Sequence, residues 1–154
     1  MQNNQEVVVC CKKQTEIDEP GKEDLYNVGT IVVIKQVTKL PGGLMRILVE
    51  GKQRAVIESL DAISEKFYTA VVTPKEEPVT TEETIIEEEA MLRVSMEAMT
   101  GYMEHFPRIA KTLQSQIQES MGLTEILDKM VANMPISYDK KQQVLAAFTA
   151  KIKP

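Results

Sequence analysis

The sequence predicts an α+β fold in which the strands come first and the helices follow. Between residues 6 and 73, apolar β-branched segments alternate with Gly- and Pro-containing stretches, as in antiparallel strands joined by turns. From residue 80 onward the apolar residues recur about every 3.6 positions, as on one face of a helix. Segregation of this kind is typical of an antiparallel sheet with separate helices, and not of an alternating parallel sheet.

The strands are bounded by turn residues. We expect them over residues 6–12, 29–40, 44–50, 52–59 and 67–73. Pro41, Gly42 and Gly43 suit a tight turn, so the second and third strands form a hairpin. Gly51 interrupts the returning strand, where we expect a bulge or sharp bend of the kind that curls a small sheet toward a barrel.

The helices begin after PKEEPVT, a linker at residues 74–80 with two prolines. Thr80 and Glu83 fit a capping box that opens a long helix over 81–105, which Pro107 ends. Shorter amphipathic helices are expected over residues 108–120, 124–134 and 138–151, the last two with N-caps at Thr124 and at Ser137 or Asp139. The predicted domains are therefore a β-rich subdomain at 1–79 and a helical subdomain at 81–154.

Composition disfavours nucleic acid and membrane partners. The net charge is −5 and aromatic residues are 5% of the chain, with no Trp. Phosphate binding needs clustered Lys and Arg, and single strands need stacking platforms. No apolar run approaches the length of about 20 residues that spans a bilayer. We therefore expect a cytoplasmic chain whose partners are proteins.

The residues of common catalytic sites are sparse. His105 is the one histidine and lies at the end of the long helix, where we expect a capping or solvated role. Cys10 and Cys11 are adjacent, so we expect two buried, reduced thiols without metal spacing. Gly51 and Lys52 are followed by Gln53, which breaks the pattern of a phosphate-binding loop. A small enzyme with an unrecognised site is the weakest alternative.

Methionine is concentrated in the helical half. The predicted stripe of the long helix contains Ile85, Leu92, Met96, Met99, Met103 and Phe106. A methionine stripe at helical spacing indicates either a core or an adaptable binding surface, because Met is flexible and apolar. Both interpretations stay open at this point.

Several motifs resemble the substrate-recognition N-terminal domain of bacterial Lon, the ATP-dependent protease. They are CCKKQ, IDEP, the box DLYNVGT at residues 24–30, the hairpin tip LPGG at 40–43 and the box LVEGKQRA at 48–55. The later stretch MPISYDKKQQVLAAF also resembles the helical part of that family. The family's first strand and its ATPase and Ser-Lys protease modules are missing from this sequence, so the resemblance implies a fragment.

The resemblance implies a β-subdomain of the pseudouridine-synthase-associated (PUA-like) barrel type, incomplete at its start. It implies a non-catalytic domain that binds unfolded or damaged protein and helps to order a homohexamer, within an ATP-dependent Ser-Lys endopeptidase that uses ATP and Mg²⁺. No cofactor or metal is expected in the fragment itself. An unpaired sheet edge would favour a dimer or strand exchange. A nucleic-acid-binding PUA-like module is the alternative, since related barrels bind RNA.

The candidate residues fall into two groups. For contact with polypeptide we expect the hairpin tip and the apolar side of the long helix: Leu40, Pro41, Met91, Met99, Met103 and Phe106. For the fold itself we expect Tyr26, Gly29, Gly51 and Arg54, the glycines for backbone shape and the other two as loop anchors. No catalytic residue is predicted.

Overall fold

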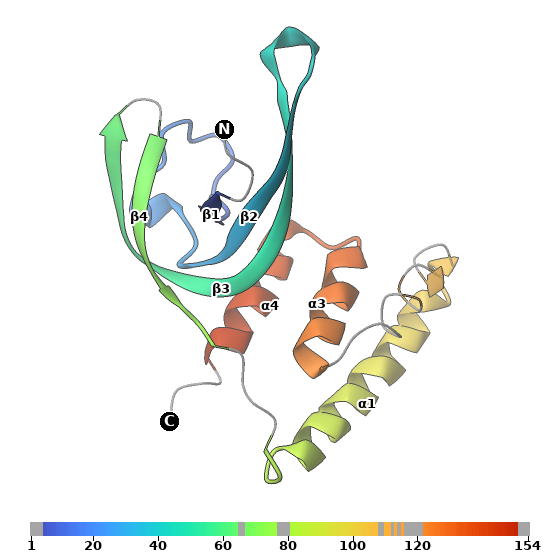
Figure 1. The fold of residues 1–154 in the computed structure, drawn as a ribbon. Helices are drawn as coiled ribbons and strands as arrows, with labels where there is room; N and C mark the ends of the chain where they lie inside the picture. The colour runs from blue at the N-terminus through green and yellow to red at the C-terminus, as the bar shows by residue number, and fades with distance from the viewer. Residues whose placement is uncertain are drawn as a thin grey trace. The chain divides into compact units, whose positions relative to one another are not determined.

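The chain divides into two compact units, Met1–Glu76 and Glu77–Pro154. A computed structural model describes residues 5–64, 67–76, 81–107, 110, 111, 113, 115 and 122–150, with the backbone alone at 62–64 and 148–150. The strands lie in the first unit and the helices in the second (Figure 1).

The first unit is built on a four-stranded antiparallel sheet. Its strands are β1 (Glu6–Val9), β2 (Val28–Lys39), β3 (Met45–Ser64) and β4 (Phe67–Pro74). Their order across the sheet is β1-β2-β3-β4, so strands that follow each other in the chain are neighbours. A short 3-10 turn, η1 (Lys22–Asp24), precedes β2, and another, η2 (Pro41–Gly43), closes the predicted hairpin between β2 and β3.

Four β-bulges interrupt the ladders, two between β2 and β3 and two between β3 and β4. Lys35 is the unpaired residue of β2, and Lys52, Glu58 and Ile63 are those of β3. A bulge bends its strand because one strand carries an extra residue. The sharp bend of β3 in Figure 1 fits these bulges. The bulge expected near Gly51 is thus confirmed at Lys52, although β3 is one continuous strand where two had been expected.

The sheet does not close into a barrel. β1 and β4 form its two edges, and within the described residues no pairing joins them. The described residues therefore do not form the expected PUA-like barrel, since closure requires a further pairing between the edges. What is confirmed is the α+β class: an antiparallel sheet first, and helices after it.

A small core holds the sheet unit together. The buried apolar residues are Leu25, Val28, Val32, Val33, Ala55 and Ile57. They lie at or near the base of the β2–β3 hairpin, where β1 also pairs. β1 is shorter than the predicted strand 6–12, because after Val9 the chain leaves the ladder and returns to it only through the bridge between Lys12 and Leu25.

The second unit contains α1 (Ile85–Met103), α3 (Leu123–Asn133) and α4 (Tyr138–Ala150). Residues 107, 110, 111, 113 and 115 are helical as well. The core consists of Met99, Leu113, Ile126 and Met130, with Leu92, Met96, Tyr102, Met103, Leu127 and Met134 packed against it. The methionine stripe of the long helix is therefore mainly core.

The starts of α1 and α3 differ from those predicted. α1 begins at Ile85, four residues later than predicted, because residues 81–84 form a turn in which the Thr84 amide donates to the Thr81 carbonyl at 3.1 Å. Thr80, half of the expected capping box, lies outside the described residues. α3 has Gly122 at its N-cap, not Thr124. α4 begins directly after Ser137, whose carbonyl accepts from the Lys141 amide at 3.2 Å.

Candidate polypeptide-binding surface

The outer part of the β2–β3 hairpin projects from the sheet as a two-stranded ribbon (Figure 1). We call residues 36–48, beyond the Lys35 bulge, the hairpin arm. At its tip, Gly42 and Gly43 have φ of 80° and 78°, a region that glycine enters without steric cost. The Leu40 amide donates to the Leu44 carbonyl at 2.8 Å and closes the turn. Residues 41–50 are all exposed.

One face of the arm, continued by the adjoining Val49, is mostly apolar, although Lys39 lies on it opposite Met45. Met45, Ile47 and Val49 alternate along β3, so their side chains share a face. Val37 lies directly opposite Ile47 in the ladder and joins them, because opposed residues of an antiparallel pair point to the same side. Together these four residues form the arm stripe. The other face is more polar and carries Gln36, Thr38, Arg46 and Leu48.

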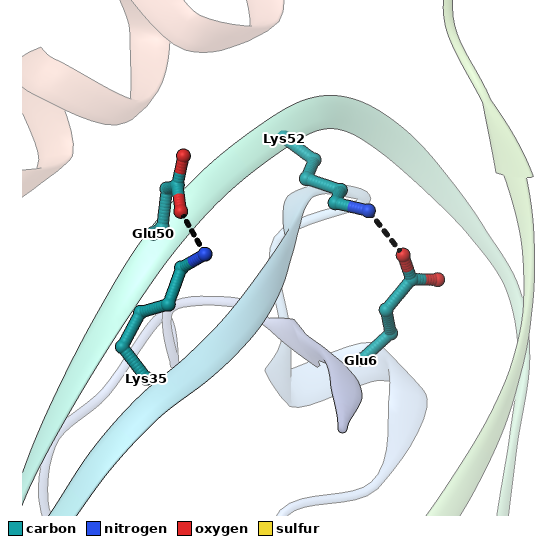
Figure 2. A network of polar contacts seen from close by, with 4 residues as sticks. All are labelled: Glu6, Lys35, Glu50 and Lys52. Atoms are coloured by element: carbon teal, nitrogen blue, oxygen red, sulfur yellow. Dashed lines mark hydrogen bonds and ion pairs between the residues drawn. The ribbon is translucent and has the colours of Figure 1, made fainter. Parts of the chain in front are cut away.

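Two ion pairs mark the place where the arm leaves the sheet (Figure 2). The Lys35 Nζ atom lies 2.5 Å from Oε2 of Glu50, and the Lys52 Nζ atom lies 2.7 Å from Oε1 of Glu6. Both lysines are bulge residues, and both carboxylates belong to residues paired with Val33, one on each side of it. The bulges at Lys35 and Lys52 thus each place a lysine beside a carboxylate, and both carboxylates lie next to Val33 of β2.

The two ion pairs shift the pKa values of Glu50 and Lys52. The hydrogen bond and charge of Lys35 lower the pKa of Glu50. The hydrogen bond and charge of Glu6 raise the pKa of Lys52. All four side chains are well exposed, so water screens the pairs and we attach little folding energy to them. Their effect is to favour one geometry at the bulges.

The structure separates the six predicted contact residues. Pro41 is exposed and Leu40 half-buried at the arm tip, while Met91 and Phe106 are exposed in the helical unit. Phe106 also contacts the ring of Tyr102, with centroids 4.8 Å apart. Met99, 4% exposed, lies in the core and Met103 packs against it, so neither lies on an open surface. Leu40 and Pro41 belong to the first unit, as do the residues of the arm stripe.

The four residues predicted to shape the fold lie in or beside the sheet core. A Cβ at Gly29 would come within 2.7 Å of the Val9 carbonyl oxygen, so a side chain does not fit there without movement. At Gly51 it would meet only the Thr30 methyl at 3.7 Å, an ordinary contact. Arg54 is buried on β3, and its carbonyl accepts from the Lys75 amide at 2.8 Å. The half-buried Tyr26 donates its amide to the Cys11 carbonyl at 3.1 Å.

The thiols differ from the expected buried pair. Both are free; Cys10 is half-buried and Cys11 exposed, because the strand ends at Val9. Burial and the neighbouring Cys11 raise the pKa of Cys10, which lowers its share of reactive thiolate.

Across the described part of the chain, no group of three His, Cys, Asp or Glu residues could hold a metal ion. None of the described helices is long and apolar enough to cross a membrane.

The arm stripe is the part of this surface that the sequence prediction missed. Met45, Ile47 and Val49 alternate with Arg46 and Leu48, which is a period-two signal. That signal indicates a strand with one apolar face but does not tell whether the face is covered. Only the projection of the arm leaves the stripe open to solvent.

The fold defines the class of protein first: an α+β domain in which an antiparallel meander is followed by a separate helical unit. The sequence then gives the family. Residues 1–153 match the family described as the ATP-dependent protease La (LON) substrate-binding domain, and the chain belongs to that family.

Curated relatives are full Lon proteases. The Lon protease of Lachnoclostridium phytofermentans is 33% identical over 144 residues, covering 94% of this chain and 18% of that protein. The Lon protease of Escherichia coli K12 is 32% identical over 145 residues, with the same two shares. That of Clostridioides difficile is 31% identical over 153 residues, covering 96% and 19%. The chain thus spans about a fifth of the length of these relatives.

A solved structure, the N terminal domain of Mycobacterium avium complex Lon protease, is similar at 18% identity. The match covers 98% of this chain and 92% of that one, with a TM-score of 0.37.

Proposed function

We propose that this chain is the non-catalytic, substrate-recognising part of an ATP-dependent Ser-Lys protease and that it holds unfolded polypeptide. The observation that carries the proposal is the family match over residues 1–153, since that family is described as substrate-binding. ATP and Mg²⁺ would be bound by the parent protein outside this domain. The place of action would be the cytoplasm.

The arm stripe and arm tip are the contact surface that we propose. An unfolded chain exposes apolar side chains that a native protein buries, and the stripe offers Ile47 and Val49 to them from an exposed ribbon. Fully burying one such side chain contributes about 1.5–3 kcal/mol, so a few contacts support weak binding with little sequence preference. Leu40 and Pro41 extend the surface at the tip, and Met91 and Phe106 are a further candidate surface in the helical unit.

Assembly is the second part of the proposal. A domain that binds weakly gains avidity when several copies act on one substrate. We propose that this domain helps to order the homohexamer of its parent. Exposed apolar side chains in both units, such as Leu44 and Ile86, support self-association.

Binding to a permanently unfolded protein tests the recognition proposal. We expect the chain to bind reduced, carboxymethylated α-lactalbumin with a Kd of about micromolar, and not to bind the native disulfide-bonded form. Replacing Leu44 and Ile47 together by Ser should weaken binding about a hundredfold or more, because two apolar contacts are lost. Fluorescence anisotropy of labelled α-lactalbumin measures the Kd.

Val9→Ser is the matched control. Val9 is 49% exposed and Ile47 is 48% exposed, and both lie on strands of the same unit, but Val9 is not on the arm. The control should bind as the wild type does. Equal binding by all variants would contradict the role of the arm, and no binding by the wild type would contradict the function.

A further inference from the structure

The hairpin arm carries positive charge and no negative charge. Residues 36–48 include Lys39 and Arg46 but no Asp or Glu, in a chain whose net charge is −5. Both cationic side chains belong to exposed residues. Lys39 lies opposite Met45 on the face of the arm stripe, and Arg46 lies opposite Thr38 on the other face. A segment that lies on either face of the arm therefore meets one cation.

The cations of the arm differ from those in the body of the sheet unit. In the body, lysine ammonium groups make internal contacts, some as donors to backbone carbonyls and others as partners of carboxylates. These lysines are Lys12, Lys13, Lys22, Lys35 and Lys52. Among the described residues, neither Lys39 nor Arg46 has a carboxylate partner. The positive charge of the arm is thus available to a ligand.

The arm also holds its cations away from the negative charge at its base. Glu50 is the first acidic residue of β3, and it is paired with Lys35. Arg46 lies about four residues before Glu50, and Lys39 about four residues beyond Lys35, which is roughly 13 Å along either strand. At physiological ionic strength, exposed charges are screened over about 8 Å. The charge at the base therefore contributes little to the potential near Lys39 and Arg46.

We propose that the hairpin arm selects unfolded segments in which apolar residues have an Asp or Glu two or three positions away. The apolar part of such a segment would cover the arm stripe, and its carboxylate would reach Lys39 or Arg46. Residues two apart on a strand are about 7 Å apart, which sets this spacing. The inference rests on the proposed function and names the substrate class of the same surface. It adds a preference for charge to apolar contacts that select little by themselves.

Two separated cations among apolar side chains fit single carboxylates better than a dense polyanion. Binding to nucleic acids or to anionic lipid surfaces needs clustered Lys and Arg. Lys39 and Arg46 lie on opposite faces of the arm, so a flat charged surface would face only one of them. An extended polypeptide can lie along either face, and there it meets apolar side chains and a cation together.

Two labelled peptides that differ only in charge test the preference. Each has a central Val-Leu-Ile-Val run, and one peptide has Glu on both sides of the run where its twin has Gln. An exposed ion pair changes a Kd about two- to threefold, so two pairs should make the Kd of the Glu peptide about fivefold lower at about 50 mM salt. At about 0.5 M salt the two Kd values should converge, because the screening length falls to a few Å. Fluorescence anisotropy measures both values.

Removal of the two positive charges is the second test. Lys39→Gln with Arg46→Gln should make the Kd values of the two peptides equal at low salt, and both positions are exposed, so the fold should be kept. Lys75→Gln is the matched control, because the Lys75 amide donates to the Arg54 carbonyl in the body of the sheet unit. This control removes one positive charge of the same unit and should keep the preference of about fivefold. Circular dichroism checks that each variant is folded.

Each outcome with the peptides decides the inference. Equal Kd values for the wild-type chain at low salt, or a preference that persists in the double variant, overturns selection by the arm. If unfolded α-lactalbumin binds in that case, the proposed function stands. If neither the peptides nor α-lactalbumin bind, the inference and the proposed function both fail.

Two other occupants of the arm would also overturn the inference. Vesicles of phosphatidylcholine and phosphatidylserine that bind more tightly than the Glu peptide, and lose this binding in the double variant, would assign the arm to a membrane surface. A dimer that dissociates in the double variant but not when the Glu peptide is added would assign the arm to a second copy. Sedimentation velocity measures this dissociation.

Discussion

Gly29 and Gly51 show that similar residues in a sequence have different physical roles. Both lie in β-rich motifs, and from sequence both were expected to serve backbone shape. In the structure Gly29 lies against the end of β1, where a Cβ would be 2.7 Å from the Val9 oxygen and 3.2 Å from Cys10 Cβ. Gly51 has room for a Cβ. A sequence indicates that a strand contains glycine, but contact with a distant segment decides whether glycine is required.

At this scale we predict that Gly29→Ala destabilises the sheet unit and Gly51→Ala does not. The Gly29 substitution forces backbone of β1 away from β2, which should cost about 1–3 kcal/mol as in other overpacked sites. Gly51→Ala should change the free energy of unfolding by less than about 0.5 kcal/mol. Urea unfolding followed by circular dichroism measures both. Equal stability of the two variants would contradict this account of Gly29.

At the scale of elements, the strands were easier to predict than their irregularities. The alternation of apolar residues and the Pro-Gly-Gly turn located β2, the hairpin and β4. The bulges at Lys35 and Glu58 had no signal, because a bulge is a property of the pairing between two strands and not of one residue type. The Lys22 ammonium donates to the carbonyl of Glu58, a bulge residue. Such contacts between distant segments explain why the curvature of β3 was only partly predictable.

The bulge ion pairs give a prediction about pH. Because Lys35 lowers the pKa of Glu50, this pair stabilises the fold above the ordinary Glu pKa of 4.5, and the contribution is lost as the pH falls through the lowered value. Lys35→Met should return the pKa of Glu50 toward 4.5, as measured by NMR titration of its side-chain carboxyl carbon. Lys52→Met should move it less, since Lys52 is only a minor cause of the shift. An unchanged Glu50 titration in Lys35→Met would refute the pairing in solution.

For Lys52 the sign is opposite. Glu6 raises its pKa, so that pair contributes below the ordinary Lys pKa of 10.5 and loses its contribution as the pH rises through the raised value. Acid therefore weakens the Lys35–Glu50 pair while alkali weakens the Lys52–Glu6 pair. Near neutral pH both bulges keep their partners.

At the scale of the whole molecule, the order of strands and helices was predictable and the closure of the sheet was not. The change of period after residue 74 separates the two kinds of structure in the sequence itself. Barrel closure depends on whether the two edge strands, β1 and β4, pair, and the pattern of residues within one strand does not tell which strand it pairs with. The sequence also could not tell which candidate contact residues are buried and which are exposed, because burial depends on packing between distant segments. Met99 and Met91 are equally apolar, yet one lies in the core and the other at the surface.

We predict that the purified chain self-associates at micromolar concentration. Apolar side chains exposed on the hairpin arm and on α1 favour contact between copies. Sedimentation velocity across this range should give a weight-average mass that rises with concentration above that of the monomer. Leu44→Ser with Ile47→Ser, the pair used for substrate binding, should reduce this rise if the arm takes part. A constant monomer mass for the wild type would contradict the proposed role in assembly.

The length of the hairpin arm has a kinetic consequence. From the Lys35 bulge to Pro41 the ribbon extends about six residues, which carries its tip roughly 20 Å away from the bend. A diffusing, collapsed chain can therefore touch the tip while the bodies of the two molecules are still separated by water. Under the proposed function, such early contact would enlarge the target for encounter, so association with substrate would be fast even though each contact is short-lived.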